Sequence, residues 1–95
     1  MNKTELVKTL AGRTGLSQKT VTAVLDALFD PDAGVVADEL AASRAVSIRG
    51  FGTFEARRAA PRLARNPRTG EAVQLGAQTR PAWRPAAPLR DRLNG

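Results

Sequence analysis

The sequence of 95 residues contains no cysteine and no histidine. Disulfides, thiolate chemistry and the usual zinc sites are therefore excluded. Catalysis would have to depend on carboxylates or lysine, and the nine acidic residues are scattered along the chain. A glycine-rich phosphate loop is also missing, because Gly50 and Gly52 lack the rest of a dinucleotide fingerprint. We therefore expect no enzymatic activity, no cofactor, no metal and no small-molecule substrate.

Long apolar runs are missing as well. No stretch approaches the roughly 18 apolar residues that a membrane-spanning helix needs. The first residues, Met1 to Glu5, do not have the apolar core of a signal peptide. These absences predict a cytoplasmic protein without a membrane partner. The length predicts a single domain, residues 1–95.

The charges are distributed unevenly between the two halves of the chain. Residues 1–43 hold four basic and six acidic side chains, which gives a net charge of −2. Residues 44–95 hold eleven basic and three acidic ones, which gives +8, and all eleven basic residues are arginine. The planar guanidinium group suits phosphate oxygens, since it can donate two parallel hydrogen bonds. The second half is therefore a candidate phosphate-binding segment, although a solvated or disordered basic face has the same composition.

The first half has the pattern of a helical hairpin. A helix is expected from about Lys3 to Thr14, with Asn2 as its N-cap. Gly15 follows as a left-handed residue that ends this helix. Ser17 then caps a second helix, whose apolar residues recur at helical spacing and form a broad stripe.

The second helix is interrupted at Asp30-Pro31-Asp32, because proline lacks an N–H and clashes with the preceding turn. We expect a kink or a short break there, followed by more helix to about Ala42. Gly34 weakens the pattern of the resumed helix.

From Ala45 the apolar period changes to two, which is typical of strands. A short strand is expected from Val46 to Ile48, followed by a tight turn at Gly50-Phe51-Gly52. The next strand begins at Thr53 and runs to Arg58.

The chain then returns to the body of the domain. Trp83, between two prolines, is expected to anchor the returning strand there. A last helix, from about Ala86 to Leu93, is expected to bury Leu89 and Leu93.

The centre of the basic half is Arg65-Asn66-Pro67-Arg68-Thr69-Gly70. Asn-Pro and Thr-Gly are turn sequences, because proline fixes φ and glycine accepts a positive φ. A turn between two arginine-bearing strands predicts the tip of a protruding β-ribbon arm, about residues 56–80. A cationic ribbon of this kind suits a nucleic-acid groove.

An arm of this length leaves fewer residues to form the hydrophobic core. If residues 56–80 project, 25 of the 95 residues add nothing to the core, and 70 remain. A body of that size without a disulfide or metal is only marginally stable alone. We therefore expect residues 1–43 to form a helical dimerisation base. The predicted dimer core consists of Val24, Leu25, Leu28, Phe29, Phe51 and Phe54.

The segments Gly50–Glu55, Arg65–Pro67 and Thr69–Glu71 resemble the signature of the bacterial histone-like HU and integration host factor family. The opening residues Met1–Leu6 and the closing segment Pro81–Pro85 follow the usual order of that family. The resemblance covers essentially the whole chain. Relative to that family, about four residues are additional, and we expect them within Asp30–Gly34. Leu63 stands where lysine is frequent.

The resemblance implies an α+β fold in an intertwined homodimer. Each subunit would contribute a helical base, a three-stranded antiparallel saddle and a β-ribbon arm, with the saddle, arm and C-terminal helix in residues 44–95. The family is nucleoid-associated and architectural, and binds and bends duplex DNA through the minor groove with little sequence specificity. Pro67 would be the wedge that enters between base pairs. The implied DNA-binding residues are Lys3, Arg57, Arg58, Arg62, Arg65, Asn66, Pro67, Arg68, Thr69, Gly70, Arg80 and Arg84.

Two other interpretations of the residues remain open. The segment Ala11–Val21 also resembles the turn of a helix-turn-helix motif, whose second helix would read base edges in the major groove. Alternatively, the chain could be a dimeric scaffold without nucleic acid, whose basic arm binds an acidic protein or stays solvated. We expect Glu71, beside the arm tip, to be a charge partner for neighbouring arginines rather than a general base.

Overall fold

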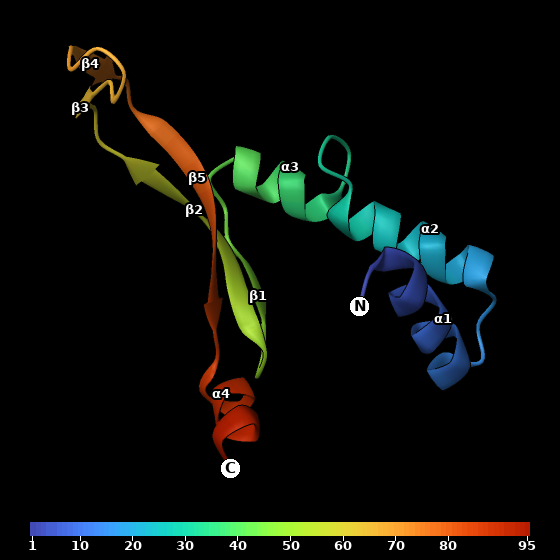
Figure 1. Cartoon of the computed structure of the whole chain (residues 1–95). Helices are drawn as coiled ribbons and strands as arrows, with labels where there is room; N and C mark the ends of the chain where they lie inside the picture. Colours follow the sequence, from blue (N-terminus) through green and yellow to red (C-terminus); the bar gives the residue numbers. More distant parts are fainter. The chain divides into compact units, whose positions relative to one another are not determined.

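The computed structural model describes residues 1–95, except for the side chain of Leu75. The chain forms two compact units, residues 1–39 and 40–95 (Figure 1). The first unit is helical, and the second is built on antiparallel strands with one helix at the end of the chain. The α+β class expected from the sequence is therefore confirmed.

The first unit contains the predicted helical hairpin, α1 (Lys3–Thr14) followed by α2 (Gln18–Phe29). The side chain of Asn2 accepts the Glu5 N–H at 2.9 Å, and Ser17 Oγ accepts the Thr20 N–H at 3.1 Å. Gly15, with φ of 73°, ends α1 in the left-handed conformation. Both predicted N-caps and the predicted glycine terminus are confirmed.

The predicted break after α2 is present, and the side chain of Asp30 stabilises the turn that forms it. Its carboxylate Oδ2 accepts the N–H groups of Asp32 at 3.1 Å and Ala33 at 2.8 Å. Helix α3 (Val35–Ala41) then begins after Gly34 and runs across the boundary between the two units. A Cβ atom on Gly34 would lie 2.6 Å from the Asp30 carbonyl oxygen and 2.8 Å from that of Leu28. Gly34 is thus required by the close approach of the backbone, and it does not prevent helix from resuming.

The second unit contains a three-stranded antiparallel sheet in the order β1-β2-β5. Its strands are β1 (Val46–Ile48), β2 (Gly52–Ala59) and β5 (Gln78–Pro85). Since β1 pairs only with Gly52–Phe54 and its first residue, Val46, lies opposite Phe54, only β5 accompanies β2 beyond Phe54. Gly50 has a φ of 79° in the turn before β2, whereas Gly52, which we expected in that turn, is already the first residue of the strand.

The two-stranded ribbon continues into β3 (Arg62–Arg65) and β4 (Ala72–Leu75). The last pair of the sheet is Ala59 with Gln78, and the first pair of the outer ribbon is Arg62 with Leu75. Both strands therefore advance by three residues across the interruption. The register does not shift, and β3 and β4 extend the ribbon away from α4 at the other end of the unit (Figure 1).

The register separates the side chains of the sheet onto two faces, because successive residues of a strand point to opposite sides. Val46, Phe54 and Trp83 are cross-strand neighbours on an apolar face. The polar face lies on the other side. Its polar residues include Ser47, Thr53, Glu55, Arg57, Arg80 and Arg84.

Trp83 is the predicted anchor of the returning strand, and its contacts agree with that role. Its ring centroid lies 5.8 Å from that of Phe51, with the planes tilted by 43°. A Cβ atom on Gly52 would lie 2.6 Å from Trp83 Nε1, so only glycine fits below the indole.

The C-terminal helix α4 (Ala87–Asn94) begins one residue later than predicted. Leu89 is half-buried, as expected, but Leu93 is 78% exposed and its predicted burial is wrong within this chain. The helix follows the end of β5 and continues beyond the sheet, which therefore does not cover its last turn (Figure 1).

The hydrophobic core is small. Among the described side chains, the buried hydrophobic ones are Val7, Val21 and Val36, all of which belong to the first unit. Four residues of the predicted dimer core are exposed in the single chain: Val24 (53%), Leu28 (37%), Phe29 (52%) and Phe51 (47%). Within the described part of the chain, no helix is long and apolar enough to cross a membrane.

Substitution of Gly34 by alanine should destabilise the helical unit. The added Cβ would overlap backbone atoms, which cannot move aside as a flexible side chain can, and such overpacking typically costs about 1–3 kcal/mol. We expect a clearly lower midpoint of thermal unfolding in circular dichroism. Gly12→Ala is the matched control, because a Cβ there meets nothing within 4 Å and alanine favours helix. Equal midpoints for the two variants would contradict the steric explanation.

Candidate nucleic-acid interface

The tip of the ribbon is held by its own hydrogen bonds. The Asn66 N–H donates to the Glu71 carbonyl at 2.8 Å, and the Gly70 N–H donates to the Asn66 carbonyl at 2.8 Å. The side chain of Asn66 accepts the Arg68 N–H at 2.9 Å, and Thr69 Oγ1 accepts the Glu71 N–H at 3.3 Å. Gly70 has a φ of 73°, as predicted for a tight reversal. Asn66, Thr69 and Gly70 thus shape the tip.

Pro67 is exposed at this tip, between Asn66 and Arg68. Proline has no N–H to donate, and the hydrogen bonds that close the turn are formed by the residues on either side of it. A rigid apolar ring is therefore presented at the outermost part of a cationic ribbon. The geometry suits insertion between apolar surfaces such as stacked bases.

The predicted arginines are all exposed along the ribbon and the sheet from which it extends. Arg57 and Arg80 are direct cross-strand partners on the polar face. Like charges placed opposite each other on a sheet repel, and this cost is relieved when an anion approaches. The other predicted arginines on strands are Arg58 in β2, Arg62 and Arg65 in β3, and Arg84 in β5.

Glu55 is the acidic residue of the polar face, and its role was not predicted from the sequence. Its Oε1 accepts hydrogen bonds from Arg57 Nε at 3.1 Å and Arg57 Nη2 at 2.9 Å. Its Oε2 lies 3.8 Å from Arg84 Nη2. The i, i+2 spacing of Glu55 and Arg57 on one strand is the sequence signal that could have indicated this ion pair.

The prediction for Glu71 is wrong. Among the described residues, its carboxylate forms no ion pair, and its backbone serves to close the tip. The reason is its position: Glu71 ends the turn, whereas Glu55 lies within a strand beside arginines that share its face.

Lys3 is the one predicted DNA-binding residue outside the second unit. Its ammonium group forms an ion pair with Asp26 across the α1–α2 hairpin, and both side chains are largely exposed. The other eleven predicted residues belong to the ribbon or the sheet.

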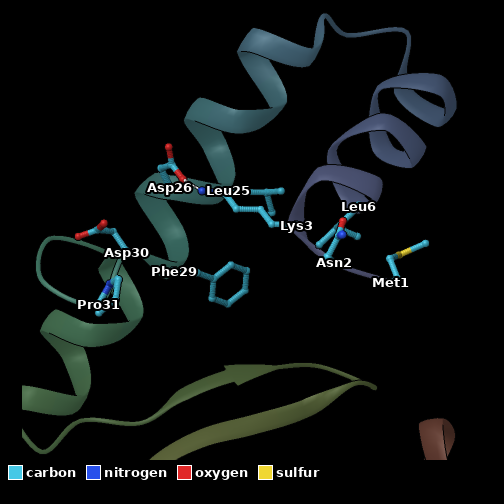
Figure 2. Close-up of a pocket in the computed structure, with 9 residues that line it drawn as sticks. All are labelled: Met1, Asn2, Lys3, Leu6, Leu25, Asp26, Phe29, Asp30 and Pro31. Carbon is cyan, nitrogen blue, oxygen red and sulfur yellow. Dashed lines mark hydrogen bonds and ion pairs between the residues drawn. The ribbon is translucent and has the colours of Figure 1, made fainter.

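Two residues of the predicted dimer core line a pocket in the first unit. Figure 2 shows Leu25 and Phe29 of α2 facing this pocket, together with Leu6 of α1. The pocket has a volume of about 530 Å³, and most of its lining is apolar. A cavity of this kind in a small helical hairpin is suited to receiving apolar side chains.

Comparisons with known proteins agree on one family. The family profile described as "Bacterial DNA-binding protein" matches residues 1–94. The chain is 42% identical over 91 residues to DNA-binding protein HU of Geobacillus stearothermophilus, covering 96% of this chain and 97% of that protein. It is 38% identical over 95 residues to DNA-binding protein HU 1 of Bacillus subtilis, covering 100% and 99%.

Solved structures show the same relationship. The cocrystal structure of Anabaena HU with DNA has a TM-score of 0.88 and 31% identity, covering 98% of this chain and 97% of that chain. HU from Thermotoga maritima has a TM-score of 0.66 and 25% identity, covering 98% of each chain. The family resemblance drawn from the glycine, proline and arginine motifs is confirmed, and the chain belongs to the bacterial DNA-binding protein family that includes the HU proteins.

Proposed function

We propose that this protein binds double-stranded DNA as a homodimer and bends it, with little preference for base sequence. The observation that carries the proposal is the β-ribbon, which presents exposed arginines along its strands and an exposed proline at its tip. The role is architectural and requires no chemical step. The protein would act in the nucleoid, where it would organise and condense the bacterial chromosome.

Affinity would come from phosphate neutralisation. Each guanidinium group that meets a phosphate releases counterions from the duplex, and this contribution does not depend on the base sequence. Arg58, Arg62 and Arg65 suit this role, because among the described residues none of them has a carboxylate partner. Their positions along one ribbon would let them follow the DNA backbone over several nucleotides.

Bending would come from Pro67. Unstacking a base step costs a few kcal/mol of free energy. Bending offsets this cost, because a bent duplex brings more phosphates into contact with the cationic surface of the protein. The hydrogen-bonded turn around Pro67 keeps the ring in position, so that less conformational freedom is lost on insertion. Asn66, Arg68, Thr69 and Gly70 would support the wedge and contact the groove beside it.

The homodimer is supported by the shortage of core within one chain. Val24 and Leu28 on α2 are 53% and 37% exposed, and the same unit contains the pocket lined in part by Leu6, Leu25 and Phe29. A second chain would cover this stripe and the apolar face of the sheet with Phe51 and Phe54. Burial of such side chains contributes about 1.5–3 kcal/mol each, which a body of this size needs.

The helix-turn-helix interpretation is less well supported. The hydroxyl side chains at the start of α2 form hydrogen bonds within the helix: Thr22 Oγ1 donates to the Gln18 carbonyl at 2.8 Å, and Ser17 Oγ binds both the N–H and the hydroxyl of Thr20. They are poorly placed to read bases. The scaffold interpretation assigns no role to Pro67 and is disfavoured by the family.

The proposed dimer predicts that stability depends on protein concentration. The thermal unfolding midpoint should rise as the chain is concentrated, because association favours the folded state. Val24→Asp should shift sedimentation toward monomer or prevent folding, since it places a charge in the proposed interface. Leu63→Asp, on the arm and 73% exposed, is the control and should leave the dimer intact. A concentration-independent midpoint with a monomeric mass would refute the dimer.

Pro67→Ala should reduce DNA bending more than it reduces affinity. The arginines remain in place, whereas alanine offers a smaller and less rigid surface between bases. The bend can be measured by energy transfer between dyes at the two ends of a short duplex, alongside titration for affinity. Pro61→Ala, an exposed proline of the same arm away from its tip, should bend DNA as the wild type does. An unchanged angle in Pro67→Ala would rule out the wedge.

Arg65→Ala should weaken binding by similar factors on duplexes of unrelated sequence. The plot of log affinity against log salt concentration should become shallower by about one for each ribbon that contacts DNA. Fluorescence anisotropy at several salt concentrations gives both quantities. Arg13→Ala, at the end of α1, removes an equal charge away from the ribbon and should leave the slope unchanged. A loss confined to one sequence would instead indicate base readout by Arg65.

A further inference from the structure

The polar face of the sheet contains three arginines and one carboxylate. Arg57 and Arg80 are opposite each other, and Arg84 is opposite Thr53. Glu55 lies between them on β2, and its side chain is only 22% exposed, whereas those of Arg57 and Arg84 are 64% and 65% exposed. The carboxylate is therefore set below the two guanidinium groups that would meet a phosphate.

The geometry of this cluster ties Arg57 closely to Glu55. Both Nε and Nη2 of Arg57 donate to the same oxygen, Oε1, and so occupy one edge of the guanidinium group. The second oxygen faces Arg84 at 3.8 Å, a distance that gives attraction without a hydrogen bond. One carboxylate thus neutralises part of the charge of two arginines.

A DNA phosphate approaching the polar face would compete with Glu55 for the same donors. The carboxylate is 2.9 Å from Arg57, which is about the distance a bound phosphate oxygen would have. The cluster also presents a net charge of +2 to the duplex, where the three arginines alone would present +3. Both effects oppose DNA binding.

We infer that Glu55 restrains DNA binding by holding Arg57 and Arg84 in ion pairs with its own carboxylate. It is a positioning residue that sets the affinity and the salt dependence of the interface. Its effect is to weaken phosphate binding at this part of the sheet, because a phosphate must replace the carboxylate as the partner of Arg57. The inference depends on the proposed DNA-binding function.

The expected size of the effect follows from the exposure of the pairs. Exposed ion pairs contribute little, so releasing them should raise affinity for duplex DNA by about two- to five-fold. If Arg57 then gains a phosphate contact, the slope of log affinity against log salt concentration should become steeper by about one for each ribbon that contacts DNA.

The test compares Glu55→Gln with wild-type protein on one unrelated-sequence duplex, by anisotropy over a range of salt concentrations. Glutamine keeps the shape of the side chain and removes its charge. Glu71→Gln is the matched control, because it makes the same change of charge on the same ribbon without releasing an arginine. We expect Glu55→Gln to bind more tightly and with a steeper slope than Glu71→Gln.

A second comparison separates release of Arg57 from a general change of charge. In an Arg57→Gln background, adding Glu55→Gln should raise affinity by less than it does in the wild-type protein, because only Arg84 is then released. Should Glu55→Gln fail to fold, Glu55→Asp withdraws the carboxylate by one methylene and should give a smaller gain in the same direction.

Three results would overturn the inference. Weaker binding by Glu55→Gln would mean that the carboxylate orients the arginines for DNA. Equal gains from Glu55→Gln and Glu71→Gln would mean that only net charge matters. Failure of the wild-type protein to bind duplex DNA would refute the proposed function itself, and the restraint with it.

Discussion

The structure of the second unit depends on the antiparallel pairing of β2 with β5. This ladder fixes which residues share a face, and it continues into β3 and β4 without a shift of register. A slip by one residue would move every side chain to the opposite face. The apolar contacts of Trp83 and the arginines of the polar face would then exchange sides, and the interface would be lost. The arm can carry its arginines outward because its backbone, and not a core, holds it together.

The residues that form the arm are not available to the hydrophobic core of the rest of the chain. An arm that contributes little to the core leaves the stability of the protein to a short helical hairpin and a small sheet. The hairpin uses local devices such as the Asn2 and Ser17 caps and the Asp30 side chain. These stabilise helix ends but bury little apolar surface. The small core of the single chain and the presence of an arm outside that core thus have the same cause, the use of about a quarter of the residues in the arm.

The sequence predicted most of the elements, because their signals are local. Caps, the glycine terminus of α1, the turn at Gly70 and the change of period at Val46 each depend on a few neighbouring residues. The failures concern contacts that the chain makes after folding. Glu71 was expected to pair with arginines, but Glu55 does so instead, since strand register placed it beside them. Leu93 was expected to be buried, yet α4 continues beyond the sheet that would have covered it.

The sequence by itself determined the order of the elements, the separation of acidic and basic halves and the turn that presents Pro67. These follow from composition, spacing and the backbone preferences of proline and glycine. Only the tertiary structure decided which charges meet. Arg57 faces Arg80 across 23 residues of chain and also binds Glu55, and no local pattern specifies both relations. Cross-strand register is a property of the assembled sheet, so the balance of attraction and repulsion on the polar face emerges only with the fold.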